Sequence, residues 1–97
     1  MKENHKLMIS IILPCYNEEK SIGRTVAKIT DVLESSNLQG YEIIIIDDGS
    51  TDKSGNILES MNGIVLLKHP SNKGYGASIK TGLSRAKYDN ICITDAD

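Results

Sequence analysis

Aromatic side chains are scarce in this chain of 97 residues, which has four Tyr and neither Phe nor Trp. A buried core must therefore be built from Ile, Leu and Val. The only cysteines, Cys15 and Cys92, are too few for the disulfide framework of a small secreted domain. We therefore expect reduced thiols and a cytoplasmic location. No apolar run approaches the roughly 20 residues of a membrane span, so we expect no membrane segment in this chain.

The chain also has no large excess of positive or negative charge, because it contains 11 basic and 13 acidic residues and its formal net charge is −2. This balance gives no basic surplus for nucleic acid and no acidic tail typical of disorder. We therefore expect no nucleic-acid partner. The length allows one small domain and is too short for two.

What the chain does contain is four short, continuous apolar runs separated by segments of helical spacing. The runs are Leu7–Leu13, Glu42–Asp47, Gly63–Leu67 and Asn90–Thr94. Runs that do not alternate with polar residues are typical of strands covered on both faces of a parallel sheet. The intervening segments are 17–37, 50–63 and 71–90. The order β-α-β-α-β-α-β predicts an α/β fold with a doubly wound, mostly parallel sheet.

Two details of the helices follow from residue type and spacing. Asn17 is a candidate N-cap of the first helix, with Glu18 and Glu19 near the positive end of its dipole. In the third helix, Ile79, Leu83 and Ala86 recur at helical spacing, which predicts the stripe that faces the sheet.

A polar cluster follows each predicted strand. In chain order the clusters are PCYNEE, DDGSTD, KHPSNKGYG and DAD. Open α/β sheets bind ligands outside the carboxyl ends of their strands, so all four clusters should meet at one edge.

Two of these clusters contain paired acids. Asp47 and Asp48 either form an ordinary strand-to-helix turn or accept hydrogen bonds from a nucleobase or ribose. Asp95 and Asp97 are spaced so that both side chains point the same way. They are either a solvated acidic terminus or the ligands of one Mg²⁺ or Mn²⁺ that clamps a diphosphate.

The glycine-rich stretch NKGYGASIKTG matches neither of the common phosphate-binding loops. Ile79 stands where a dinucleotide fingerprint needs Gly, and the Gly-Lys-Ser/Thr ending of a Walker loop is absent. We predict instead a helix start that packs closely against its neighbours. Lys73 lies either near a phosphate or in a purely structural position, and His69 is expected to be a loop residue.

Together, the four motifs resemble the inverting family-2 glycosyltransferases of the GT-A fold, with the closest likeness to polyprenyl- and dolichol-phosphate sugar synthases. The motifs that carry the likeness are ISIILPCYNEEKSIGRTV, YEIIIIDDGSTDKS, NKGYGASIKTGL and ICITDAD. The resemblance covers nearly the whole chain. It implies strand order 3-2-1-4 and the nucleotide-binding half of a GT-A fold.

The resemblance also implies site residues. Pro14, Tyr16, Asn17 and Glu18 fall where the family lines its nucleotide pocket, and Asp47 and Asp48 fall where it contacts base and ribose. Asp95 and Ala96 match positions beside the ribose and diphosphate, with Asp95 also a metal ligand, and Asp97 matches the principal metal ligand. The implied ligands are a UDP- or GDP-sugar and Mg²⁺ or Mn²⁺. The implied acceptor is one such as a polyprenyl phosphate, with the full-length protein at the cytoplasmic membrane face.

Catalytic domains of this family need roughly twice this length, with the acceptor half and general base beyond the Asp-x-Asp motif. Residues 1–97 are therefore expected to be an N-terminal, nucleotide-sugar-binding half that is inactive alone, with its general base unassigned. A bare fourth strand would then favour a homo-oligomer through that edge. A non-catalytic nucleotide-binding or assembly module of the same fold is the alternative. A haloacid dehalogenase-type phosphatase fits less well, because its Asp-x-Asp follows the first strand.

Overall fold

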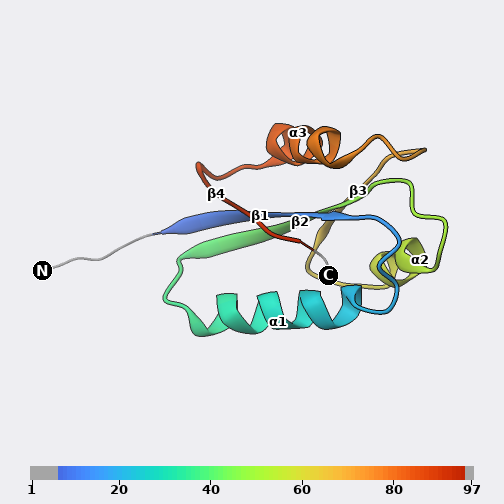
Figure 1. Cartoon of the computed structure of the whole chain (residues 1–97). Coiled ribbons are helices and arrows are strands. Elements are labelled where there is room, and N and C mark those ends of the chain that lie inside the picture. Colours follow the sequence, from blue (N-terminus) through green and yellow to red (C-terminus); the bar gives the residue numbers. More distant parts are fainter. Residues whose placement is uncertain (1–6, 96–97) are drawn as a thin grey trace, which may run out of the picture.

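The structure, a computed structural model, describes residues 7–95 and has alternating strands and helices (Figure 1). The strands are β1 (Met8–Cys15), β2 (Gly40–Asp47), β3 (Val65–Lys68) and β4 (Asn90–Ile93). The helices are α1 (Ile22–Ser35), α2 (Ser54–Glu59) and α3 (Tyr75–Arg85). The predicted order of elements is confirmed, with boundaries that differ by one to several residues.

The four strands form one parallel sheet in the order β3-β2-β1-β4. This confirms the α/β class, the parallel sheet and the order 3-2-1-4. The register pairs Pro14 with Ile46 and Cys15 with Asp47, so β1 and β2 end side by side. The ladder continues beyond them, because the Asp48 N–H donates to the Cys15 carbonyl at 2.8 Å.

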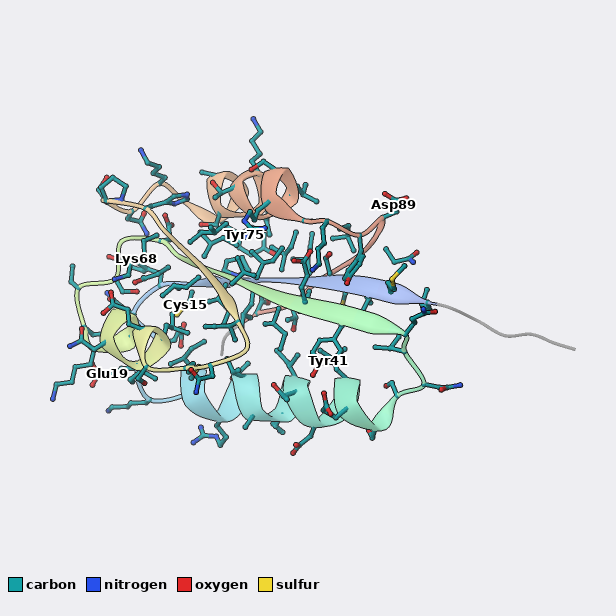
Figure 2. The ribbon with its side chains drawn as sticks, turned by 180° about the vertical axis from the view of Figure 1, so that it is seen from behind. Cys15, Glu19, Tyr41, Lys68, Tyr75 and Asp89 are labelled. Carbon is teal, nitrogen blue, oxygen red and sulfur yellow. The ribbon has the colours of Figure 1, made fainter. Side chains whose placement is uncertain are left out.

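Helices cover both faces of the sheet, with α1 and α2 on one side and α3 on the other (Figure 1). The isoleucine run of β2 serves both layers: Ile43 and Ile45 pack toward α1, and Ile44 and Ile46 toward α3. Figure 2 shows side chains filling the space on either side of the strands. Each of these isoleucines is buried, which contributes about 1.5–3 kcal/mol per side chain.

The predicted apolar stripe of α3 is confirmed at Ile79 and Ala86, which pack against the isoleucines of the sheet, but not at Leu83. Leu83 is 47% exposed, whereas Ser78 and Gly82 are buried, so the predicted apolar stripe is wrong at Leu83. The physical reason is a close approach: a Cβ at Gly82 would lie 2.7 Å from Cγ2 of Ile12. The missing side chain at Gly82 therefore sets which face of α3 turns inward.

Strand β4 is exposed along its length, with Ile91 at 36% and Ile93 at 44% exposure. The expectation from its apolar run, that it would be covered on both faces, is therefore wrong for this strand. The bare fourth strand that the implied strand order predicted is confirmed, because β4 lies at the edge of the sheet. Self-association through β4 stays a prediction. No helix between residues 7 and 95 is long and apolar enough to cross a bilayer.

Candidate functional site

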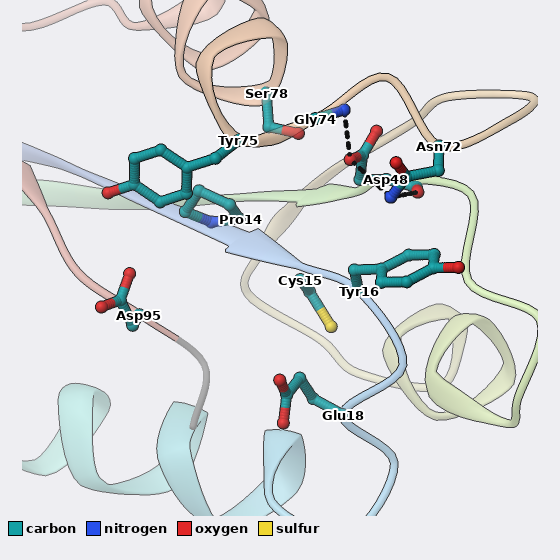
Figure 3. Close-up of a pocket in the computed structure, with 10 residues that line it drawn as sticks. All are labelled: Pro14, Cys15, Tyr16, Glu18, Asp48, Asn72, Gly74, Tyr75, Ser78 and Asp95. Carbon is teal, nitrogen blue, oxygen red and sulfur yellow. Dashed lines mark hydrogen bonds between the residues drawn. The ribbon is translucent and has the colours of Figure 1, made fainter.

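A cavity of about 520 Å³ opens at the carboxyl edge of the sheet, within the size range of small-molecule sites (Figure 3). It is lined by Pro14, Cys15, Tyr16, Glu18, Asp48, Asn72, Gly74, Tyr75, Ser78 and Asp95. These residues follow all four strands, although they are far apart in the sequence. The expectation that the four polar clusters meet at one edge is therefore confirmed.

The loop after β1 is fixed by the turn after β2. Asn17 has a positive φ of 53°, and its Oδ1 accepts hydrogen bonds from the N–H groups of Thr51 at 2.8 Å and Asp52 at 3.2 Å. The predicted N-cap role of Asn17 is wrong, because α1 begins several residues later, after Ser21, and its first turn contains no acid. Asn17 positions the loop from outside the group that lines the cavity, and its predicted ligand contact stays a prediction.

Asp48 organises the segment that leads from β3 into α3. Its Oδ1 accepts hydrogen bonds from His69 Nδ1 at 2.7 Å and the Lys73 N–H at 2.9 Å. Its Oδ2 accepts from Asn72 Nδ2 at 3.1 Å and the Gly74 N–H at 2.9 Å. The contact of Asp48 with base and ribose stays a prediction. Both of its carboxylate oxygens already have protein partners, so Asp48 mainly stabilises the loop between β3 and α3.

The neighbouring carboxylate, Asp47, turns away from the cavity. Its Oδ1 accepts from the Ser50 N–H at 3.1 Å, and its Oδ2 lies so near Gly55 that a Cβ there would approach it to 2.9 Å. The adjacent acids therefore separate, with Asp48 lining the cavity and Asp47 facing α2. A ligand contact from Asp47 stays a prediction.

Cys15 lines the cavity as a protonated thiol. It is buried, and its pKa is raised to about 11, first by burial and then by the charge of Asp47. A thiol of this kind is a poor nucleophile at neutral pH. Both cysteines are free, as expected, but Cys92 is exposed whereas Cys15 is buried.

Asp95 brings an exposed carboxylate to the cavity, on the side of β4 (Figure 3). Carboxylate oxygens are ligands that Mg²⁺ and Mn²⁺ accept together with phosphate oxygens and water, so Asp95 fits one position of a metal site. The other predicted positions, Ala96 and Asp97, lie outside the described residues. Between residues 7 and 95, no three His, Cys, Asp or Glu side chains form a metal-binding group.

Five cavity residues were not assigned as site residues from the sequence: Cys15, Asn72, Gly74, Tyr75 and Ser78. The glycine-rich pattern predicted a close-packed helix start, and that signal placed the segment near the site. Which of its side chains face the cavity depends on the rotation of α3, which Gly82 sets. Lys73 is present in the same segment, but its backbone N–H, bonded to Asp48, is the group that shapes the site.

Protonation of Asp48 should lower the stability of the folded protein at acidic pH. Burial raises the pKa of the Asp48 carboxyl, but hydrogen bonds from His69, Lys73 and Gly74 outweigh it and leave the pKa below the ordinary value of 3.8. Because the folded pKa is depressed, this stabilisation is present above about pH 4 and is lost as pH falls through the folded pKa.

Urea unfolding of the wild type and Asp48→Asn between pH 7 and pH 2.5 measures this contribution. We expect the difference in unfolding free energy between the two proteins to shrink as pH falls below 4, because the substituted amide does not titrate. If the difference in unfolding free energy stayed constant over this pH range, the ionised Asp48 carboxylate would not be the group that stabilises the loop.

An open parallel sheet with a cavity at its carboxyl edge is the arrangement in which α/β proteins commonly bind ligands. The model of the family "Glycosyl transferase family 2" matches residues 10–97. The chain therefore belongs to glycosyl transferase family 2, and the resemblance drawn from its motifs is confirmed.

Curated relatives agree with this assignment. The chain is 31% identical to a dolichyl-phosphate β-glucosyltransferase of Trichomonas vaginalis, over 95% of this chain and 31% of the relative. It is 35% identical to an undecaprenyl-phosphate 4-deoxy-4-formamido-L-arabinose transferase of Aeromonas hydrophila, over 93% of this chain and 29% of the relative. The chain thus spans about a third of the length of the relatives it matches.

Solved structures share the fold. A mannosyltransferase of Pyrobaculum calidifontis, in complex with GDP-Man and Mn²⁺, has a TM-score of 0.77 at 23% identity, over 92% of this chain and 27% of that chain. TarS of S. aureus in complex with UDP has a TM-score of 0.82 at 23% identity, over 94% of this chain and 28% of that chain.

Proposed function

We propose that this chain forms the donor-binding part of a glycosyltransferase, which holds a nucleoside-diphosphate sugar and a divalent metal ion for transfer of the sugar to an acceptor. The observation that carries the proposal is the convergence of polar residues from all four strand ends on one cavity. The acceptor class we propose is a polyprenyl phosphate. The names of the two relatives, a dolichyl-phosphate and an undecaprenyl-phosphate sugar transferase, support it.

The chemistry of the lining residues suits such a donor. Tyr16 and Tyr75 are 44% and 58% exposed, so their rings are available to stack on a flat base. Asp95 would be one ligand of the metal, and Asp97 would be the second. A bound Mg²⁺ or Mn²⁺ would neutralise the diphosphate as the bond between it and the anomeric carbon breaks. In an inverting transfer, the acceptor oxygen attacks that carbon from the opposite side.

Binding of UDP and GDP, with and without Mn²⁺ or Mg²⁺, tests this function by isothermal titration calorimetry. We expect weak binding of at least one nucleotide that requires the metal, because Asp95 can reach the diphosphate only through it. Asp95→Ala should lower the affinity for the nucleotide at least tenfold, because it removes one charge-assisted contact and a contact of this kind changes affinity by about that much.

Asp89→Ala is the matched control, since Asp89 is exposed and precedes β4 at its other end. It should bind as the wild type does. Equal nucleotide affinity with and without metal would contradict the proposed role of Asp95, and the absence of any nucleotide binding would contradict the proposed function itself.

A further inference from the structure

Ser78, on the inner face of α3, has a side-chain hydroxyl without a partner. The residue is fully buried, and its Oγ has no hydrogen bond to any group in the described part of the chain. Its neighbours on the same helix behave differently: Thr81 Oγ1 donates to the Ala77 carbonyl at 3.0 Å, and Ser84 Oγ donates to the Thr81 carbonyl at 2.7 Å. A buried polar group of this kind is uncommon and calls for an explanation.

The hydroxyl belongs to the wall of the cavity. Ser78 lines it, and Figure 3 shows the side chain reaching from α3 toward the space bounded by Gly74, Tyr75 and Pro14. The start of α3 adds further donors there, because the first N–H groups of a helix have no acceptor within it. The N-cap, Gly74, has no side chain to cap them. The N–H groups of Lys73 and Gly74, which precede the helix, both donate hydrogen bonds to the Asp48 carboxylate.

The charges around this wall select the kind of ligand. The acidic side chains of the cavity are Glu18, Asp48 and Asp95, and no Lys or Arg of the described residues lines it. A phosphate next to Asp48 would be repelled, so a neutral polar group fits better. Tyr16 and Tyr75 flank the same space (Figure 3) and favour a flat ring.

We propose that Ser78 is a base-selecting residue, whose hydroxyl donates a hydrogen bond to a carbonyl oxygen on the edge of the nucleobase. The inference rests on the proposed function, since it names the contact that the base of the sugar donor makes at that site. Because Ser78 lines the cavity, its hydroxyl is placed to meet a ligand bound there. The hydroxyl thus lacks a partner in the free protein because its partner is the ligand.

The inference gives two effects of opposite sign for Ser78→Ala. The variant removes a buried hydroxyl without a partner, so the free protein should be at least as stable, with a thermal midpoint higher by about 5 °C. It also removes a contact to the base, so affinity for the better-bound of UDP and GDP should fall about five- to tenfold. Uracil and guanine both carry a carbonyl oxygen, so the other nucleotide should lose less affinity only as far as its carbonyl lies farther from Ser78, and the preference between the two should then narrow.

Calorimetric titration of UDP and GDP with Mn²⁺ into the wild type, Ser78→Ala, Ser78→Cys and Ser84→Ala tests the inference. Ser78→Cys keeps the size of the side chain but donates weakly, so it should lose affinity as Ser78→Ala does. Ser84→Ala changes an exposed serine on the same helix and should bind as the wild type does.

The outcomes separate the two proposals. A wild type that binds neither nucleotide would overturn the donor-binding function and, with it, the role of Ser78. A wild type that binds, with Ser78→Ala and Ser78→Cys binding both nucleotides equally well, would overturn the role of Ser78 alone. A fall in affinity that accompanies an equal loss of thermal stability would show a structural role instead.

Discussion

Replacing Gly49 by Ala is expected to lower the free energy of unfolding by about 3–5 kcal/mol, a large part of the stability of a small domain. Gly49 has φ of +74°, which costs an L-residue about 1–2 kcal/mol. A Cβ at this position would also lie 2.4 Å from the Ser71 carbonyl carbon and 2.5 Å from the Asn72 nitrogen. These are backbone atoms that cannot rotate away, so the loop after β3 would have to leave the turn after β2. A chain of this size has about 5–15 kcal/mol in all.

Urea unfolding followed by circular dichroism measures this loss. Gly23→Ala is the matched control, because its Cβ would meet nothing within 4 Å and the residue lies in α1. That change should leave stability unchanged or raise it by up to about 1 kcal/mol. If the unfolding free energy of Gly49→Ala lay within about 1 kcal/mol of the wild-type value, the loops after β2 and β3 would not be in the close contact described.

Replacing Asp48 by Ala should have the second-largest effect. We expect the free energy of unfolding to fall by about 3–4 kcal/mol and most of the nucleotide affinity to be lost. The change leaves four donors, on His69, Asn72, Lys73 and Gly74, without their acceptor. Hydrogen bonds to a charged group contribute about 1.5–3 kcal/mol each, and water restores part of them once the loop opens. The start of α3 would then no longer be held beside β1.

Amide hydrogen exchange of Lys73 and Gly74 reports this change directly, because both N–H groups are bonded to Asp48. We expect both amides to lose protection in Asp48→Ala. Asp31→Ala, at an exposed position of α1, is the control and should stay within about 0.5 kcal/mol of the wild type. Protected Lys73 and Gly74 amides in Asp48→Ala would contradict the structural role of this carboxylate.

The strands and their parallel arrangement could be predicted because continuous Ile-rich runs such as Ile43–Ile46 suit strands covered on both faces. Strand order came from the resemblance of the motifs. The same interpretation was wrong for the β4 run, with Ile91 and Ile93, because an apolar run does not reveal whether its strand lies at the edge of the sheet.

The candidate site was predictable at the level of segments and less so at the level of side chains. Polar clusters at strand ends placed Pro14, Tyr16, Glu18, Asp48 and Asp95 around one cavity. Spacing alone could not show that Asn17 binds the neighbouring turn, because that contact joins residues 34 positions apart. Nor could it show that Ser78 faces the cavity, since the rotation of α3 depends on a tertiary contact at Gly82.

Amide chemical-shift mapping with UDP or GDP and Mg²⁺ tests most directly whether the strand-end clusters form one nucleotide-sugar site. We predict shifts of the amide signals of residues 15–18, 48, 72–78 and 95, which vanish when the metal is removed with a chelator. The second cavity, an apolar groove beside α1 and β4 lined by residues such as Ile29, Leu33 and Cys92, should be unaffected. Shifts confined to that groove, or none at millimolar nucleotide, would contradict the account.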